Sequence, residues 1–151
     1  ALRAGESYHP PVEDPDDPQH AISVDALERL EAATDARGRP FEVVKLPAPG
    51  PLTVAADEAA GVEASAGTQP RRAGDRMAAS YVNFYLGNSR VVYPLLDPAR
   101  DEEAGKILAA TFPDREVVGV PAREILLGGG NIHCITQQVP RRGSGGSGSG
   151  G

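Results

Sequence analysis

The chain has 151 residues, of which 40% are hydrophobic and 24% are charged, and its formal net charge is −6. This length suits one domain with a single core and is too short for two ordinary domains. A negative charge gives no basic surface for nucleic acid or an anionic membrane, so we expect neither partner. The single cysteine cannot form an internal disulfide, and no apolar run approaches the roughly 20 residues of a membrane helix. We expect a soluble, cytoplasmic protein.

Residues 1–19 are polar and rich in proline, and they show no sustained hydrophobic period. This composition predicts an exposed lead-in loop. His9 and His20 lie in or beside the loop, and neither has a carboxylate or a second histidine at a spacing typical of metal ligands. We therefore expect both imidazoles to be solvated, and we expect no metal and no other cofactor.

A helix and a strand follow the lead-in. Ser23 predicts the N-cap of a helix with one apolar stripe, and Gly38 is expected to end that helix. Residues 41–46 are strand-like, and closely spaced prolines stop the strand at once. Residues 47–75 are rich in alanine, glycine and proline, which predicts a long loop of the kind that is usually functional or flexible.

The next segments predict a complete strand, strand, helix, strand unit. Residues 80–86 and 90–95 are rich in β-branched and aromatic residues and flank a Gly-Asn-Ser turn, which predicts a β-hairpin. Asp97 predicts the N-cap of a helix that ends before Pro113, and residues 116–120 predict another strand. The earlier helix and strand repeat the second half of this unit, which favours a fragment of a larger repeated fold.

Two features are expected to lie outside the core. The pairs Arg71-Arg72 and Arg141-Arg142 are isolated basic dipeptides, and we expect them to be solvated. Residues 143–151 contain only glycine and serine, which is typical of a flexible linker.

The only cysteine, Cys134, follows three consecutive glycines at positions 128–130. Glycines allow backbone dihedrals that other residues avoid and a close approach to a ligand, so Cys134 is a candidate nucleophile. The alternative is a buried cysteine that packs as a small hydrophobe. The alternation of residues after the glycines predicts a short buried strand.

Residues 128–138 resemble the C-terminal signature of the agmatine deiminase family, within the guanidine-modifying pentein superfamily. Further stretches that carry this resemblance are Asp14–Gln19, Ala73–Arg76, Ser80–Tyr85 and Val118–Glu124. The resemblance implies an α/β fold, a propeller of five ββαβ blades. This chain would supply about the last two blades, as a partial pentein α/β propeller with a mixed sheet. Residues 1–11 match poorly, residues 12–142 would form the C-terminal part of a deiminase-like domain, and residues 143–151 a tail.

The resemblance also implies hydrolysis of agmatine to N-carbamoylputrescine and ammonia, in putrescine and polyamine biosynthesis. In that chemistry the Cys134 thiolate attacks the guanidinium carbon and forms a covalent thiouronium intermediate. Gly129 matches a position whose carbonyl contacts the substrate in this family, with a simple turn glycine as the alternative. Asn83 lies on a matching strand, and its two expected roles are to reach the pocket or to bond the backbone at the hairpin. The family's Gly-His-x-Asp motif, which supplies the acid/base, does not occur in these 151 residues. His133 is a poor replacement, because neighbours on a strand face opposite ways, and its expected role is packing, either in the core or behind the residues that contact the substrate.

Two alternatives stay open. The first is a fragment of a deiminase that acts on free or peptidyl arginine. The second is a non-catalytic α/β module that associates with a complementary chain or a second copy, because open blades leave strand edges unpaired. On the agmatine hypothesis the partner is a small guanidine substrate, and the isolated chain is expected to be inactive.

Overall fold

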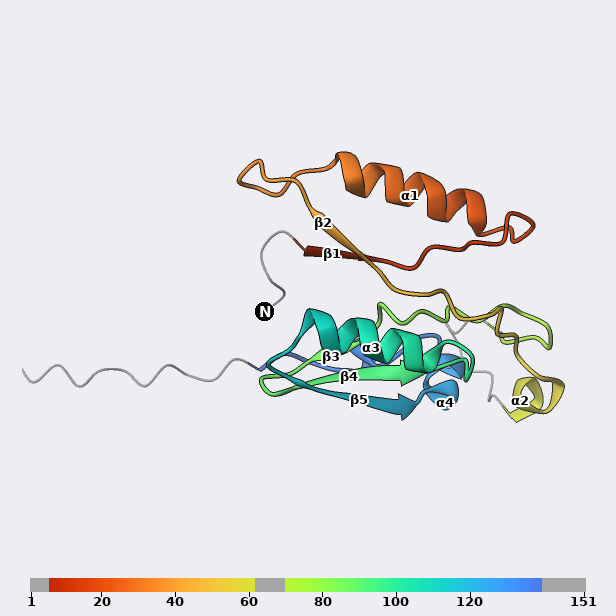
Figure 1. The fold of residues 1–151 in the computed structure, drawn as a ribbon. Helices are drawn as coiled ribbons and strands as arrows, with labels where there is room; N and C mark the ends of the chain where they lie inside the picture. The colour runs from red at the N-terminus through yellow and green to blue at the C-terminus, as the bar shows by residue number, and fades with distance from the viewer. Residues whose placement is uncertain (1–5, 62–69, 140–151) are drawn as a thin grey trace, which may run out of the picture.

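The structure is a computed structural model that describes residues 6–61 and 70–139, and this part of the chain has an α/β fold with parallel and antiparallel strand pairs (Figure 1). One sheet pairs β1 (Glu6–His9) with β2 (Glu42–Lys45) in parallel. The other has the order β3-β4-β5. The glycine- and serine-rich tail and the pair Arg141-Arg142 lie outside the described residues.

The first unit consists of β1, α1 (His20–Ala32) and β2, and α1 contacts β2. The prediction of an exposed loop over residues 1–19 is therefore wrong at β1. Its pairing partner follows the whole of α1, so no local pattern signals the strand. The helix also ends earlier than expected, at Ala32. Gly38, whose φ is 75°, instead closes the turn that leads toward β2, where its N–H donates to the carbonyl of Asp35 at 2.9 Å.

His9 and Ser23 connect the end of β1 to α1. His9 is only 4% exposed, and its Nε2 lies 3.1 Å from the Ser23 hydroxyl, so the expectation of a solvated His9 is wrong. Ser23 does not cap the helix, because α1 begins three residues earlier. Its Oγ accepts a hydrogen bond from the Val12 N–H at 3.0 Å and donates to the Pro10 carbonyl at 3.3 Å. His20 is also partly buried, with Nδ1 2.6 Å from the Val12 carbonyl oxygen.

The segment predicted as a long loop contains a short helix, α2 (Ala56–Gly61). The Arg123 guanidinium holds this helix, because it forms an ion pair with Glu58 and donates a hydrogen bond to the Thr53 carbonyl at 3.0 Å. The Glu58 carboxylate also accepts the Ala55 N–H at 2.7 Å. The helix depends on a partner far along the chain, which explains why the sequence pattern did not predict it.

The second unit confirms the predicted order of strand, strand, helix, strand. The strands β3 (Tyr85–Leu86) and β4 (Arg90–Leu95) are antiparallel, and β4 is parallel to β5 (Glu116–Pro121). The helix α3 (Asp101–Thr111) contacts both β4 and β5. The hairpin is shorter than predicted, because residues 80–84 form a turn and an irregular segment before β3.

Asp97 and Asp101 both hold the chain where it enters α3. Asp97 caps the turn directly before the helix, close to its predicted role, because its Oδ1 accepts the Ala99 N–H at 3.0 Å and its carbonyl accepts the Asp101 N–H at 2.8 Å; the helix itself begins later than predicted, at Asp101. Asp101 Oδ1 accepts hydrogen bonds from the N–H groups of Leu96 and Asp97, at 2.8 and 3.0 Å. It also accepts the Tyr81 hydroxyl at 2.6 Å. The other carboxylate oxygen of Asp97, Oδ2, accepts the Gly50 N–H at 3.0 Å, which joins the proline-rich segment to the second unit. Burial, together with the bond to Asp101, raises the pKa of Tyr81.

Aromatic rings join the two units. The ring of Tyr8 on β1 lies edge-on to Phe84, with centroids 5.2 Å apart, and stacks on Phe112 at 6.2 Å. Phe84 and Phe112 are themselves in contact, with centroids 5.8 Å apart, and both are buried. Edge-to-face and offset contacts are the favourable geometries for such pairs. This cluster holds β1 against the segment that enters β3.

The buried Tyr81 hydroxyl and its carboxylate acceptor make a testable contribution to stability. We expect Tyr81→Phe to lower the free energy of unfolding by about 1.5–3 kcal/mol, because it removes a hydrogen bond to a charged acceptor. Asp101→Ala should cost more, because two backbone N–H groups and the tyrosine lose their acceptor together. Asp101→Asn, which keeps a carbonyl oxygen, should cost less than Asp101→Ala. Urea denaturation measures all three, and equal losses for the two Asp101 variants would contradict this account.

Candidate active site

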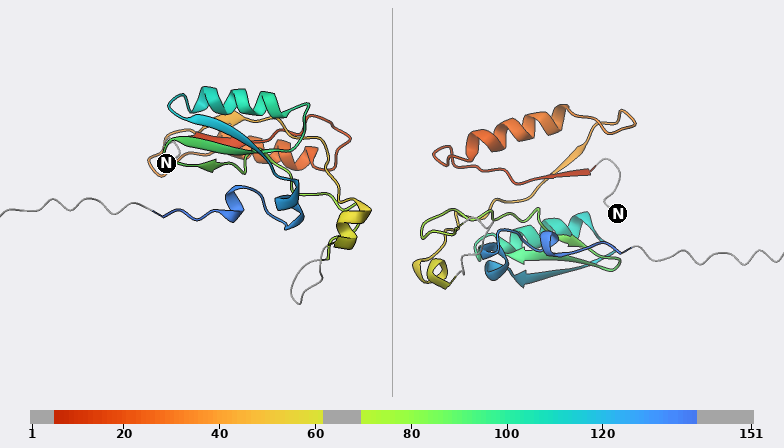
Figure 2. Two further views of the ribbon diagram at one scale, coloured as in Figure 1. Left: turned by 90° about the horizontal axis from the view of Figure 1, so that it is seen from below. Right: turned by 180° about the vertical axis from the view of Figure 1, so that it is seen from behind.

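Cys134 lies in a short 3-10 helix, η1 (His133–Ile135), which follows α4 (Arg123–Leu127) and the glycine triplet. The prediction of a buried strand here is wrong, and so is the alternative of a buried, packed cysteine, because Cys134 is exposed. The segment from α4 to residue 139 lies at the side of the three-stranded sheet away from α3 (Figure 2). The thiol is therefore available to a ligand.

The glycine turn has the two properties expected from the sequence. Gly129 has a φ of 89°, a conformation that favours glycine over residues with a Cβ. Gly130 lies directly against the cysteine, since a Cβ added to it would be 2.9 Å from Cys134 Cβ and 3.6 Å from Sγ. A side chain at this position would push Cys134 out of place.

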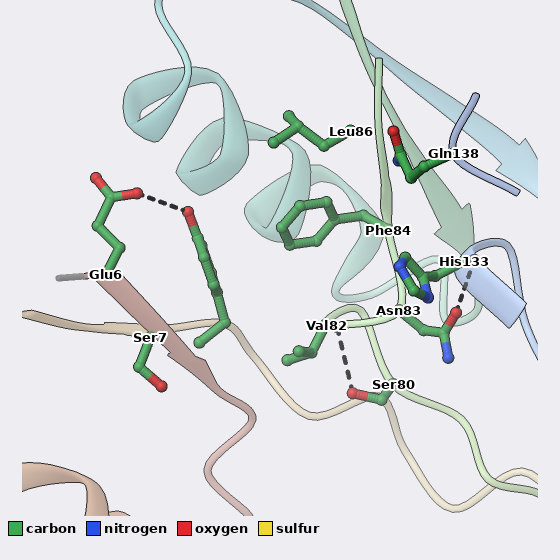
Figure 3. Close-up of a pocket in the computed structure, with 10 residues that line it drawn as sticks. Glu6, Ser7, Ser80, Val82, Asn83, Phe84, Leu86, His133 and Gln138 are labelled. Carbon is green, nitrogen blue, oxygen red and sulfur yellow. Dashed lines mark hydrogen bonds between the residues drawn. The ribbon is translucent and has the colours of Figure 1, made fainter. Parts of the chain in front are cut away.

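Asn83 connects the thiol to the second unit. Its Oδ1 accepts the backbone N–H of His133 at 2.8 Å, and its Nδ2 donates to Cys134 Sγ at 3.2 Å. One planar amide thus fixes both the start of η1 and the sulfur, and Figure 3 shows the bond to His133. The Asn83 hydrogen bond, helped by the backbone of Asn131, lowers the pKa of the Cys134 thiol, because a donor to sulfur stabilises the thiolate.

A cavity of about 660 Å³ lies between β1 and the segment that enters β3 (Figure 3). Asn83 and His133 line it, whereas Cys134 is not one of its lining residues. The cavity lining combines apolar side chains with polar groups, namely Glu6, Ser7, Tyr8, Ser80, Val82, Asn83, Phe84, Leu86, His133 and Gln138. His133 is exposed and lines the cavity, so burial of its side chain in the core, one of the two packing roles expected for it, is wrong. The sequence argument that His133 must face away from Cys134 assumed a strand. It does not apply here, because successive residues of a 3-10 helix are about a third of a turn apart and do not face opposite ways.

Arg71 is a neighbour of the glycine turn that the sequence did not indicate. It is partly buried, and its Nε donates to the Leu127 carbonyl at 3.2 Å. The expectation of a solvated pair is therefore wrong for Arg71, although Arg72 is exposed. Arg71 and Leu127 are far apart in the sequence, so no local pattern could reveal the contact.

The structure thus brings Cys134 and Asn83 together and places Gly129 in the adjoining turn. The sequence missed Asn131, which is fully buried, with Oδ1 accepting the Ile132 N–H at 2.8 Å. Its Nδ2 finds no hydrogen-bond partner among the described residues. Within residues 6–61 and 70–139, no group of three or more His, Cys, Asp or Glu side chains is arranged to hold a metal ion. In the same part of the chain, no helix has the length and apolar character needed to cross a membrane.

Several known proteins are similar to this chain. A protein from Latilactobacillus sakei, provisionally named an agmatine deiminase, is 55% identical over 129 residues, which cover 85% of this chain and 35% of the relative. A protein from Shewanella sp. strain W3-18-1 with the same provisional name is 54% identical over 138 residues, which cover 91% of this chain and 37% of the relative. The chain therefore spans little more than a third of the length of these curated relatives.

Among solved structures, the agmatine deiminase of Enterococcus faecalis superposes with a TM-score of 0.81 at 38% identity, covering 91% of this chain and 38% of that one. The superposition shows that the two proteins share the α/β fold with its mixed sheet. Residues 5–140, most of the chain, match the family described as Porphyromonas-type peptidyl-arginine deiminase. The chain belongs to that family of deiminases.

Proposed function

We propose that this chain is the nucleophile-bearing part of an agmatine deiminase, an enzyme that hydrolyses agmatine to N-carbamoylputrescine and ammonia. The observation that carries the proposal is the contact between the Asn83 amide and the Cys134 thiol, directly after a turn of three glycines. An exposed thiol whose pKa is lowered by a fixed donor has the properties of an attacking cysteine.

In the proposed reaction, Cys134 Sγ attacks the guanidinium carbon and forms a C–S bond. The C–N bond to one terminal amino group then breaks, and ammonia leaves with a proton delivered by a general acid. Water attacks the resulting thiouronium carbon, which releases the ureido product and regenerates the thiolate. Asn83 would hold the sulfur in place throughout, because its amide is itself fixed by the His133 N–H. Gly129, at the turn, would present its backbone to the substrate.

The names of the relatives support agmatine as the substrate in preference to other guanidines. Two relatives more than 50% identical to this chain carry the provisional name agmatine deiminase. The similar structure from Enterococcus faecalis is named an agmatine deiminase without that qualification. The family description favours peptidyl-arginine as the second candidate substrate. Comparison of turnover on agmatine, free arginine and a peptide with an internal arginine decides between them, and a preference for either arginine substrate would overturn the agmatine assignment.

The general acid and the carboxylates that would hold the guanidinium belong, on this proposal, to a longer chain of the length of the relatives. The two units of the fold would then be two blades of a pentein propeller, with the cavity lined by Asn83 and His133 facing the remaining blades. A complementary chain or a second copy could occupy the same face. The reaction is placed in the cytoplasm, a prediction that depends on the sequence alone.

The first prediction concerns the nucleophile. In a protein of full length that contains this sequence, Cys134→Ala should abolish agmatine turnover, because no other residue of the chain supplies a thiol. Release of ammonia from agmatine measures it. Asn88→Ala, an exposed substitution in the β3–β4 turn, is the matched control and should retain activity. Normal turnover by the Cys134 variant would exclude the proposed mechanism.

The second prediction concerns the isolated chain. We expect the 151-residue chain alone to give little or no turnover of agmatine, because a nucleophile without its general acid and guanidinium-binding carboxylates loses most of the rate enhancement. The same ammonia assay measures it, with the full-length protein as reference. Comparable rates for the two would mean that these 151 residues contain the whole site.

The third prediction concerns the thiol pKa. Asn83→Leu removes the donor to Sγ, so the pKa of Cys134 should rise and less thiolate should be present near neutral pH. Alkylation by iodoacetamide should then be slower at pH 7 and should approach the wild-type rate at high pH, where both thiols are ionised. Asn83→Asp should raise the pKa further, because a carboxylate repels the thiolate. An unchanged pH profile for both variants would remove Asn83 from this role.

A further inference from the structure

Arg71 and Cys134 lie against neighbouring residues of the glycine turn, Arg71 against Gly129 and Cys134 against Gly130. Arg71 Nε donates to the carbonyl of Leu127, the last residue of α4, at 3.2 Å. A Cβ built on Gly129 would overlap its Nη2 and lie 3.4 Å from its Cζ. The guanidinium therefore bonds the end of α4 and also lies against the backbone of Gly129, in the middle of the turn.

The contact between Arg71 and Gly129 is one residue away from the contact between Gly130 and Cys134. Gly129 lies against Arg71, and the next residue, Gly130, lies so close to Cys134 that a Cβ added there would be 2.9 Å from the cysteine Cβ. Two successive glycines of the turn are thus in close contact, one with the guanidinium and the next with the cysteine. Three consecutive glycines have wide conformational freedom, so the path of this turn requires external contacts to become unique.

The chemistry of arginine suits this position. A planar guanidinium presents several N–H donors in a rigid fork, and its positive charge is favourable beside the unpaired carbonyls at the end of a helix. The bond to the Leu127 carbonyl orients the side chain, and its outer nitrogen then covers Gly129. Gly129 at this position thus meets two requirements, the positive φ and the space taken by Arg71.

We propose that Arg71 is a positioning residue for Cys134, which fixes the path of the glycine turn and so holds the thiol in contact with Asn83. This proposal depends on the proposed function only for its effect on turnover. The position of the thiol itself can be tested without any substrate.

The test is a double-mutant cycle of Arg71→Ala and Gly129→Ala in the 151-residue chain, measured by the pH dependence of Cys134 alkylation with iodoacetamide. In Arg71→Ala the turn is no longer fixed against Asn83, so the thiol pKa should rise and alkylation at pH 7 should slow at least threefold. Gly129→Ala should slow alkylation strongly when Arg71 is present. It should do so several-fold less in the Arg71→Ala background, where the overlap with the guanidinium is gone.

Two variants separate positioning from general loss of structure. Arg71→Lys, which can still donate to the Leu127 carbonyl, should recover part of the wild-type pH profile. Arg72→Ala removes the exposed neighbouring arginine and should leave the profile unchanged. The urea midpoint of each variant is measured in parallel, since a purely structural role would lower the midpoint without moving the thiol pKa of the folded protein.

The outcomes distinguish this inference from the proposed function. An unchanged alkylation profile in Arg71→Ala, or equal effects of Gly129→Ala in both backgrounds, overturns the positioning role even if the full-length protein hydrolyses agmatine. In that full-length protein, Arg71→Ala should reduce kcat for agmatine about tenfold or more. If the wild-type enzyme does not act on agmatine, the proposed function fails, and the alkylation cycle still decides the role of Arg71.

Discussion

The Asn83 amide is the contact on which the candidate site depends. Its two ends bond different atoms of the C-terminal segment, the His133 N–H at 2.8 Å and the Cys134 sulfur at 3.2 Å. Because Asn83 precedes β3 and Cys134 follows α4, this amide joins two parts of the chain that the fold must first bring together. A charge-stabilising donor to sulfur favours the thiolate, so the same contact that positions the thiol also tunes it.

The rest of the structure holds Asn83 and the glycine turn in place. Tyr8, Phe84 and Phe112 pack β1 against the segment that carries Asn83. On the other side, Arg123 ties α2 to the start of α4. The first set of contacts packs beside Asn83, and the second fixes the start of the helix that leads into the glycine turn. Both help to define the position of the Cys134 thiol.

Membership in a deiminase family links the arrangement around Cys134 to the chemistry proposed for it. Guanidinium carbon is a weak electrophile that needs a strong nucleophile, and an exposed cysteine with a lowered thiol pKa supplies one. The chain covers little more than a third of its relatives. The Asn83 amide donates to the Cys134 sulfur, whereas the Gly-His-x-Asp motif does not occur in the given 151 residues.

The sequence by itself determined the order of elements in the second unit and the importance of the glycine triplet and Cys134. These are local properties: β-branched runs, a helix between two strands, and glycines at a turn where φ is 89°. Only the tertiary structure decided the features that depend on distant partners. The strand β1, the buried His9, the bond from Tyr81 to Asp101 and the place of Arg71 against Gly129 all depend on residues well separated along the chain. The same reason made the predicted strand at Cys134 a 3-10 helix, because Asn83 bonds the His133 backbone N–H at the start of that turn.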